Sequence, residues 1–452
     1  MRTRGIGAAS TQTFLQNYNR LASGAKGYIP ETDITSVETV PRYDELEAAG
    51  LEREGRKAMS STVHILLNGG LGTSMGLAGP KAFLQVKQNL SFLDIILERA
   101  KRLGRRILFM HSAATRQACL PVIEGTLEQD DDLPVEFVQA VVPKVDAADL
   151  GPAVWEADPT MEWCPPGHGD LYPSLYDSGI LDSLLAAGFR YAFVSNIDNL
   201  GADLDPTILG HMVHEGLAFV MEVTIRTPAD SKGGHLARTI DGRLILRERS
   251  QCPDEDLPRF EDVSRHRFFN TNNLWIELGA LRDLLKKRSG VLGLPLICNP
   301  KTIDPRQPGS PEVLQLETAA GSAIGAFERS GAVLVPRSRF SPVKTTDDLL
   351  AVRSNAYILT PEFQCRLDPR RKEPPTIRLD RRYFAIITDF EHRFPAGAPS
   401  LIECKELTVS GDVTFGKDVV IEGRSRIRIP DQQAVRIPSR AVITGAWPDW
   451  AS

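Results

Sequence analysis

The sequence predicts an α/β protein with a Rossmann-like mixed, mostly parallel sheet, followed by a C-terminal parallel β-helix. Three observations favour this fold. Short apolar runs alternate with helix-like segments from about residue 61. These runs are continuously apolar, which is typical of parallel strands covered on both faces. Near the C-terminus, apolar residues recur every six positions.

We expect three regions, because 452 residues are too many for one ordinary core. Residues 1–60 are predicted to form an N-terminal helical segment, broken at Pro30 and Pro41. Residues 61–395 form the predicted α/β domain, and residues 396–452 the predicted β-helix domain. The last boundary falls in the Pro- and Gly-rich stretch FPAGAPS.

Periodicity predicts the elements of the central region in order. The predicted strands are Val63–Leu67, Arg106–Met110, Val135–Ala140, Tyr191–Ser195 and Phe219–Thr224. Amphipathic stretches predict helices at Leu93–Leu103 and Gly179–Ala187.

Two turn signals follow these strands and helices. Asp241-Gly242 lies between His235–Thr239 and Arg243–Arg247, which favours a hairpin with a type I′ turn. The polar stretch Pro253–Asp256 predicts a surface loop.

The C-terminal periodicity consists of two interleaved six-residue series. They are Val409, Phe415, Ile421 and Ile427, and Leu407, Val413 and Val419. Intervening glycines suit the short faces of a β-helix, although a few ordinary antiparallel strands would also explain the pattern.

Composition excludes several classes of function. A net charge of −5 gives no electrostatic reason to expect nucleic acid or a membrane surface as a partner. The six cysteines contain no CxxC pair, which disfavours a zinc site or a disulfide framework and indicates a reducing cytoplasm. We expect no membrane span, because no apolar run approaches the ~18 residues required. We expect no secretion signal either, because the N-terminus MRTRGIGAAS has no apolar segment of the kind that a signal peptide contains.

The segment LNGGLGTSMGLAGPKAF, residues Leu67–Phe83, follows a predicted strand and is rich in glycine. Backbone N–H groups in such a loop can converge on a phosphate. The loop is not a Walker A motif, because Lys81 lies between Pro80 and Ala82. It also departs from a dinucleotide fingerprint, since Gly76 comes one position late and no carboxylate ends the second strand. A purely structural turn therefore stays open on spacing alone.

The loop resembles the nucleotide-binding loop of the eukaryotic-type UDP-glucose pyrophosphorylases (UTP–glucose-1-phosphate uridylyltransferases). Further blocks match that family in the same order: PPGHGD (Pro165–Asp170), FVSNIDNLGA (Phe193–Ala202), FVMEV (Phe219–Val223), KGG (Lys232–Gly234), FNTNNLWI (Phe269–Ile276), NPKT (Asn299–Thr302), QLETA (Gln315–Ala319), VPRSRFSPVKTT (Val335–Thr346) and LTVSGDVTFGK (Leu407–Lys417). The resemblance covers roughly residues 60–445. It implies a GT-A-like nucleotidyltransferase sheet in residues 61–395 and an enzyme of carbohydrate metabolism that joins UTP and glucose 1-phosphate.

The resemblance also implies the residues of a nucleotide site. They are Leu67, Asn68, Gly69, Gly70, Lys81, Gln139, Gly167, Asn196, Asp198 and Lys344. Lys344 and Lys81 match the catalytic and phosphate-contacting lysines, Gln139 the residue that reads the uracil edge, and Asp198 the ligand of Mg²⁺. Taken singly, each has a common structural explanation, such as a solvated lysine or an aspartate at a turn.

A sugar phosphate site is implied in the same way. Its residues are Gly69, Gly70, His168, Gly234, Asn270, Asn272 and Glu317. Asn273 has an alternative role in satisfying buried backbone. The chain departs from the family at Val142-Pro143-Lys144, where relatives usually have Tyr-Pro-Arg.

Two alternative functions stay open. A pyrophosphorylase for another UDP-sugar, such as UDP-N-acetylhexosamine, would use related chemistry, although His168 and the Ser74-Met75 pair favour glucose. A catalytically silent nucleotide-sugar sensor or scaffold is disfavoured, because Lys81, Asp198 and Lys344 are all present. The C-terminal region is a candidate contact for a homo-oligomer, but its tail AWPDWAS differs from relatives, so assembly is not carried over.

Overall fold

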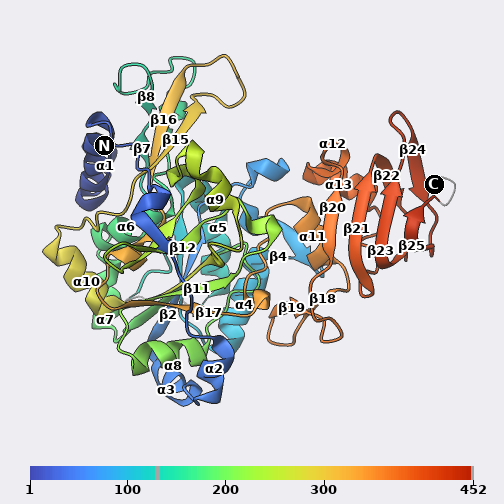
Figure 1. Cartoon of the computed structure of the whole chain (residues 1–452), viewed down its shortest axis with the longest axis horizontal. Helices are drawn as coiled ribbons and strands as arrows, with labels where there is room; N and C mark the ends of the chain where they lie inside the picture. Colours follow the sequence, from blue (N-terminus) through green and yellow to red (C-terminus); the bar gives the residue numbers. More distant parts are fainter. Residues whose placement is uncertain (128–132, 449–452) are drawn as a thin grey trace.

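The computed structural model describes residues 1–127 and 133–448. Figure 1 shows a large α/β body and, beside it, a smaller block of strands made by the C-terminal part of the chain. The end of the unlike tail, residues 449–452, lies outside the described residues. No helix in the described ranges is both long enough and apolar enough to cross a membrane.

A ten-stranded mixed sheet forms the centre of the body, and seven of its strands follow the order β1-β12-β14-β10-β2-β5-β6. The other three branch from this path: β11 pairs with β14, β17 pairs with β11, and β13 pairs with β12. Strands β10, β2, β5 and β6 are consecutive and parallel, whereas β14 runs antiparallel to β10 and β11. The strands are β1 Ile34–Ser36, β2 Thr62–Asn68, β5 Ile107–His111, β6 Glu136–Val138, β10 Tyr191–Asn196, β11 Phe219–Ile225, β12 His235–Thr239, β13 Leu244–Arg247, β14 Phe268–Glu277 and β17 Ser330–Leu334. The expected mixed α/β fold is confirmed.

Helices cover both faces of this sheet, which explains why its central strands are apolar throughout. Every residue of β2 is buried. Val63 and Ile65 pack toward α6, α7 and α10, whereas Leu66 packs toward α4 and α5. These helices are α4 Phe92–Leu103, α5 Ala113–Thr126, α6 Leu171–Asp177, α7 Ile180–Ala186 and α10 Leu278–Lys287. The predicted helices Leu93–Leu103 and Gly179–Ala187 correspond to α4 and α7.

The N-terminal segment contains helices, as predicted, and also contributes to the main sheet. Its helices are α1 Ala8–Ala22, α2 Tyr43–Ala48 and α3 Glu52–Ala58, and α3 packs on α8 Pro206–His214. Strand β1 pairs antiparallel with β12, from Ile34 opposite Thr239 to Ser36 opposite Ala237. The domain boundaries remain predictions.

Two turn predictions are corrected. The hairpin β12–β13 is present, but its turn has three residues, and only Gly242 has positive φ, at 90°. A type I′ turn would need two consecutive positive φ angles, so that prediction is wrong. Pro253–Asp256 is only partly a surface loop, because Pro253 and Asp256 are buried and Asp256 lies 3.5 Å from Arg247. The short helix α9 Leu257–Glu261 follows.

Smaller β units surround the site and the junction with the C-terminal block. In three two-stranded units, β3 Gln85–Lys87 pairs with β4 Leu90–Ser91, β7 Val142–Pro143 with β9 Trp163–Cys164, and β18 Tyr357–Leu359 with β19 Cys365–Leu367. A three-stranded unit has β16 Glu312–Glu317 between β15 Ile297–Thr302 and β8 Val145–Asp146. Helices α11 Thr346–Arg353, α12 Arg381–Phe384 and α13 Ile387–Arg393 lead to the C-terminal strands.

The C-terminal strands pair only in parallel. Strands β20 Thr376–Leu379, β21 Cys404–Ser410, β23 Val420–Arg428 and β25 Val442–Trp447 form one sheet, and β22 Asp412–Phe415 and β24 Ala434–Ile437 form another. All seven residues of the two six-residue series are at most 2% exposed. Parallel pairing excludes the antiparallel alternative for these strands.

Candidate active site

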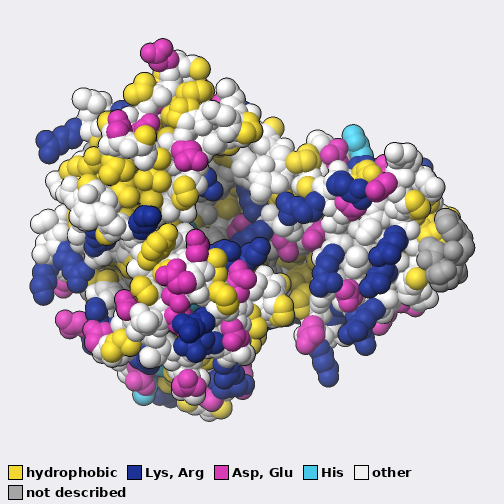
Figure 2. Space-filling view, turned by 45° about the horizontal axis from the view of Figure 1, so that its top comes forward, with side chains coloured by type: hydrophobic (Ala, Val, Ile, Leu, Met, Phe, Trp, Pro, Cys, Tyr) yellow, Lys and Arg dark blue, Asp and Glu magenta, His cyan; other side chains and the backbone are white. Residues whose placement is uncertain are grey.

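The predicted nucleotide residues meet where three parallel strands end. In the register of the sheet, Leu67 of β2 lies opposite Asn196 of β10, and Asn68 lies opposite His111 of β5. Ligands of open α/β sheets bind beyond the carboxyl ends of such strands. Figure 2 shows a hollow in the body near its junction with the C-terminal block, with Lys and Arg side chains at the rim.

The glycine loop leaves β2 and returns on itself. Gly72 and Gly76 have φ angles of 67° and 68°, which flank the short 3₁₀ turn Thr73–Met75. The N–H of Lys81 donates to the carbonyl of Gly70 at 3.2 Å. No heavy atom outside the neighbouring residues lies within 4 Å of the place where a Cβ on Gly70 would project. The loop therefore leaves open space beside its exposed backbone, as close approach of a phosphate requires.

Lys81 and Asp198 form a direct ion pair across this loop. Lys81 Nζ lies 2.6 Å from Asp198 Oδ2, and the two side chains are 12% and 15% exposed. Asp198 Oδ1 is buried and has no hydrogen-bond partner in the described structure. A carboxylate oxygen without a donor has the chemistry to bind a cation.

Lys344 reaches the same region from a different part of the chain. The N–H of the preceding residue, Val343, donates to the carbonyl of Asp198 at 3.1 Å. The backbone N–H of Lys344 donates to the Asp348 carboxylate at 2.9 Å, at the start of α11. Lys344 itself remains solvent-accessible. Its positive charge acts on His168 and on Glu248. Lys81 thus contacts Asp198 through its side chain, and Lys344 directly follows a residue that contacts Asp198 through the backbone, so the three residues belong to adjoining segments.

The PPGHGD segment packs against the QLETA segment. Gly167 has φ 78°, and a Cβ there would lie 2.5 Å from the Thr318 carbonyl oxygen. Gly169 N–H donates to the same carbonyl at 2.8 Å. Only glycine fits this close approach with this φ.

His168 is held in one tautomer by the backbone. Its Nδ1 accepts a hydrogen bond from the Ala320 N–H at 2.9 Å. Desolvation, and then the charge of Lys344, lower the pKa of His168 to about 4, so the imidazole is neutral at pH 7. Because Nδ1 accepts, Nε2 must carry the proton. The ring therefore offers an N–H donor rather than a base or a charge.

Gln139 and Asn68 differ in what they can offer a nucleotide. Gln139 Nε2 donates to the Gly167 carbonyl at 2.9 Å, and its Oε1 lies close to Gly69. Asn68 is 0% exposed, and its side chain contacts His111 Nδ1 at 3.2 Å. Asn68 is therefore enclosed, backbone included, whereas Gln139 keeps an oxygen at the edge of the loop.

The asparagines of β14 lie at an irregularity of the sheet. The β11–β14 register shifts between Met221 and Val223, and within that stretch Asn272 has φ 58°. Asn272 Nδ2 donates to Asn196 Oδ1 at 3.0 Å, while Asn272 Oδ1 is buried and unpaired among the described atoms. An unpaired buried acceptor at this strand end suits a hydroxyl donor from a ligand.

Asn273 takes the alternative role noted above. It is 0% exposed and donates to the Arg339 carbonyl at 3.2 Å. Asn273 therefore satisfies buried backbone.

Glu248 is a residue that the sequence reading missed. A Cβ on Gly234 would lie 2.6 Å from Glu248 Oε2, so this carboxylate covers the KGG segment. Burial raises the pKa of Glu248, and Lys344 partly offsets the effect. Burial also raises the pKa of Glu317, and a hydrogen bond from Asn299 lowers it by a smaller amount. A signal was available, because Glu248 directly follows the predicted strand Arg243–Arg247.

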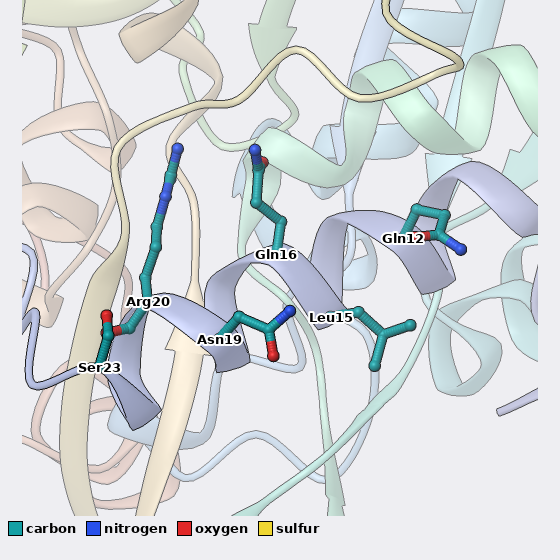
Figure 3. A pocket seen from close by; sticks show the side chains of 6 residues that line it. All are labelled: Gln12, Leu15, Gln16, Asn19, Arg20 and Ser23. Carbon is teal, nitrogen blue, oxygen red and sulfur yellow. The ribbon is translucent and has the colours of Figure 1, made fainter.

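Lys144 and the hollow on α1 lie outside this arrangement. Lys144 is 4% exposed and donates to the Ile303 carbonyl at 2.9 Å, so it braces β8 and β15 rather than facing a ligand. The hollow on α1, of about 420 Å³, is lined by residues of that helix and by Ser23, which follows it. Figure 3 shows Gln16 and Arg20 pointing toward the loop above them.

The site combines the ammonium groups of Lys81 and Lys344, the Asp198 carboxylate with one unpaired oxygen, the N–H donor of neutral His168 and the exposed backbone of the glycine loop. These groups lie at the carboxyl ends of the parallel strands. Within the described ranges no group of three or more His, Cys, Asp or Glu is placed to hold a metal. A cation at Asp198 would therefore share its coordination with phosphate oxygens and water, as Mg²⁺ commonly does. This fold and site define a nucleotidyltransferase, which works by positioning and charge neutralisation.

Comparison with known proteins identifies the family. The family model for UTP–glucose-1-phosphate uridylyltransferase matches residues 11–422. The uridylyltransferase of Solanum tuberosum is 38% identical over 442 residues, covering 95% of this chain and 90% of its own. A mutant UDP-glucose pyrophosphorylase from Leishmania major, solved with UDP-glucose, superposes with a TM-score of 0.92 at 41% identity, covering 99% of this chain and 97% of that one. The Trypanosoma brucei protein gives 0.89 at 42% identity, with 99% and 97% covered. The chain belongs to the UTP–glucose-1-phosphate uridylyltransferase family.

Proposed function

We propose that this chain transfers the uridylyl group of UTP to glucose 1-phosphate in the presence of Mg²⁺. A phosphate oxygen of glucose 1-phosphate attacks the α-phosphorus of UTP, the bond from that phosphorus to the bridging oxygen breaks, and pyrophosphate leaves. The observation that carries the proposal is the convergence of Lys81, Asp198 and Lys344 beside the glycine loop. No covalent enzyme intermediate is needed, because the attacking group is already an anion.

The backbone from Leu67 to Gly70 is assigned to the base and the triphosphate. Gln139, with one amide oxygen near Gly69, and Gly167, held close to Thr318, would enclose the uracil. Asn196 would contact the nucleotide while its side chain is oriented by Asn272.

The phosphates would be held by Lys81 and Lys344. In the ligand-free pair Lys81 is already aimed at Asp198, so an arriving phosphate would exchange with the carboxylate for the ammonium group. Asp198, through its unpaired Oδ1, would hold Mg²⁺, which supplies charge neutralisation at the phosphates. Lys344 would stabilise charge that develops at the α-phosphate.

Glucose 1-phosphate would lie between the PPGHGD, KGG and NTNN segments. The Nε2–H of His168 would donate to the sugar phosphate, as the accepting role of its Nδ1 implies. Gly234, Asn270, Asn272 and Glu317 are assigned to the sugar hydroxyls, with Asn270 9% and Asn272 8% exposed.

The C-terminal block is proposed to be a parallel β-helix, supported by its parallel pairing and its buried six-residue series. A homo-oligomer through this block and a cytoplasmic location are also proposed, the latter supported by six free cysteines.

Turnover of glucose 1-phosphate and of N-acetylglucosamine 1-phosphate with UTP and Mg²⁺ tests the proposal. We expect a clear preference for glucose 1-phosphate. A preference for the N-acetylated sugar would assign the chain to the alternative activity, and no turnover of either would support the scaffold alternative.

A further inference from the structure

Asn199 lies directly after the proposed metal ligand and makes every hydrogen bond that an amide side chain can make. It is 5% exposed. Its Nδ2 donates to Asn273 Oδ1 at 3.1 Å and to the Arg339 carbonyl at 3.2 Å. Its Oδ1 accepts from the N–H groups of Gly201 and Ser341, at 3.2 and 2.9 Å. Two donors and two acceptors are thus all used.

These bonds join two segments that carry different parts of the site. Asn199 belongs to the turn that presents Asp198, whereas Arg339 and Ser341 belong to the segment that leads to Lys344. The two segments also meet through their backbones: Asn199 and Pro342 form an antiparallel bridge, and Val343 N–H donates to the Asp198 carbonyl at 3.1 Å. The Asn199 side chain therefore ties the turn that carries Asp198 to the segment that leads to Lys344, about 150 residues further along the chain.

A buried charge network holds Arg339 and Asn273, the two residues to which the Asn199 side chain donates, in place. Glu222 is 0% exposed and accepts from Arg339 Nε and Nη2 at 2.8 and 2.6 Å, and from Asn273 Nδ2 at 3.0 Å. Trp275 Nε1 donates to the same carboxylate at 2.9 Å. Burial disfavours the charge of Arg339, but Glu222 outweighs this and raises the Arg339 pKa. Asn199 is thus anchored to a scaffold with few alternative arrangements.

We propose that Asn199 is a positioning residue for uridylyl transfer, which acts by holding Asp198 and Lys344 at a fixed separation across the triphosphate. The inference rests on the proposed roles of Asp198 and Lys344. Misplacement of a catalytic group by about 1 Å can lower a rate about 100-fold. The backbone contacts of Pro342 and Val343 hold the two segments side by side, and the Asn199 side chain adds the bonds to Arg339 and Ser341 that fix how the segments lie relative to one another. Asn199 contacts neither substrate nor metal in this role.

The test compares Asn199→Ala with Lys344→Ala and with the double variant. A matched control is Asn17→Ala, because Asn17 is a buried asparagine (4% exposed) on α1, outside the site. Steady-state kinetics give kcat and both KM values, calorimetry gives Tm, and titration calorimetry with UTP gives Kd. Asn199→Asp serves where the alanine variant fails to fold, since it keeps the acceptor for Ser341 and Gly201 but loses both donors.

We expect Asn199→Ala to lower kcat about 100-fold with the Kd for UTP changed less than about threefold. Asn17→Ala should lower Tm without lowering kcat of the folded fraction. In the double variant, loss of Asn199 should add less than about threefold to the effect of Lys344→Ala, because the two changes remove one interaction.

Fully additive losses overturn the positioning role while leaving Lys344 as a catalytic residue. An Asn199 variant with lowered Tm but unchanged kcat overturns it as well, since that is the result of a structural role. Unchanged kcat in Lys344→Ala refutes the proposed role of the lysine, and with it the link through Asn199.

Discussion

Replacing Lys81 with methionine removes the ammonium group of the Lys81–Asp198 pair and keeps most of the side-chain stem. Opposite unit charges 2.6 Å apart attract by about 6 kcal/mol at an effective dielectric constant near 20. Desolvation of both groups, which are 12% and 15% exposed, cancels much of this attraction. We therefore expect the free energy of unfolding to fall by about 1–3 kcal/mol, measured by urea denaturation without ligands.

The loss of activity should exceed the loss of stability, because Lys81 is also proposed to neutralise phosphate charge. Removing one preorganised electrostatic contact typically lowers rate constants by about 10²–10³-fold. We expect kcat/KM for UTP to fall by that amount in Lys81→Met, measured at saturating glucose 1-phosphate. Lys417→Met, at an exposed lysine of the C-terminal block, is the matched control and should leave both quantities unchanged.

One result would refute this reasoning directly. If Lys81→Met loses stability but keeps kcat/KM for UTP within about threefold of the parent, the pair with Asp198 is structural, and the lysine does not meet the phosphates. Equal losses in Lys417→Met would show that lysine-to-methionine changes lower activity without regard to position.

Three further predictions follow from the same structure. Gly167→Ala should lower the free energy of unfolding by several kcal/mol or abolish UTP binding, because φ is 78° and the new Cβ would meet the Thr318 carbonyl at 2.5 Å; a variant with unchanged Tm and Kd contradicts it. Burial, followed by the charge of Arg116, lowers the pKa of His111 to about 4. The unfolded chain therefore binds protons below pH 7 that the folded chain does not, and His111→Asn should reduce by about 1 kcal/mol the loss of stability between pH 7.5 and 6. Chelation of divalent cations should stop turnover, and Asp198→Asn should raise the Mg²⁺ concentration needed for half-maximal rate, whereas an unchanged requirement would place the ion elsewhere.

Sequence periodicity predicted the elements that are dominated by burial. Strand β2 and helix α4 appear within one residue of the predicted ends, because one is apolar throughout and the other has Ser91 as an N-cap and Gly104 as a left-handed C-cap. The turn at Asp241-Gly242 was mispredicted because its type depends on loop length, and the Asp-Gly pair also fits a three-residue turn.

Some residues of the candidate site could be predicted from the sequence, and others could not. Lys81 and Asp198 are found by resemblance, and the structure pairs them. Asn199 was missed because its partners Asn273, Arg339 and Ser341 lie far away in the chain, and no local spacing encodes those contacts. Glu248 was missed although it directly follows a predicted strand. Asn68 shows the converse, since a residue in the matching motif turns its side chain into the core.

The positions that break local rules are those that bring the site together. A regular β14 would place Asn272 and Asn273 on opposite faces of the sheet. The register shift instead lets Asn273 bond Glu222 inside the body while Asn272, at φ 58°, reaches Asn196 at the end of β10. Left-handed backbone at a non-glycine residue costs about 1–3 kcal/mol and persists only where the surroundings fix it, and here the buried network of Glu222 and Arg339 does so. The strain at Asn272 and the rigidity around Asn199 are therefore two consequences of one buried network. This network joins β14, which is proposed to contact the sugar, to the segment that carries Lys344, which is proposed to contact the phosphates.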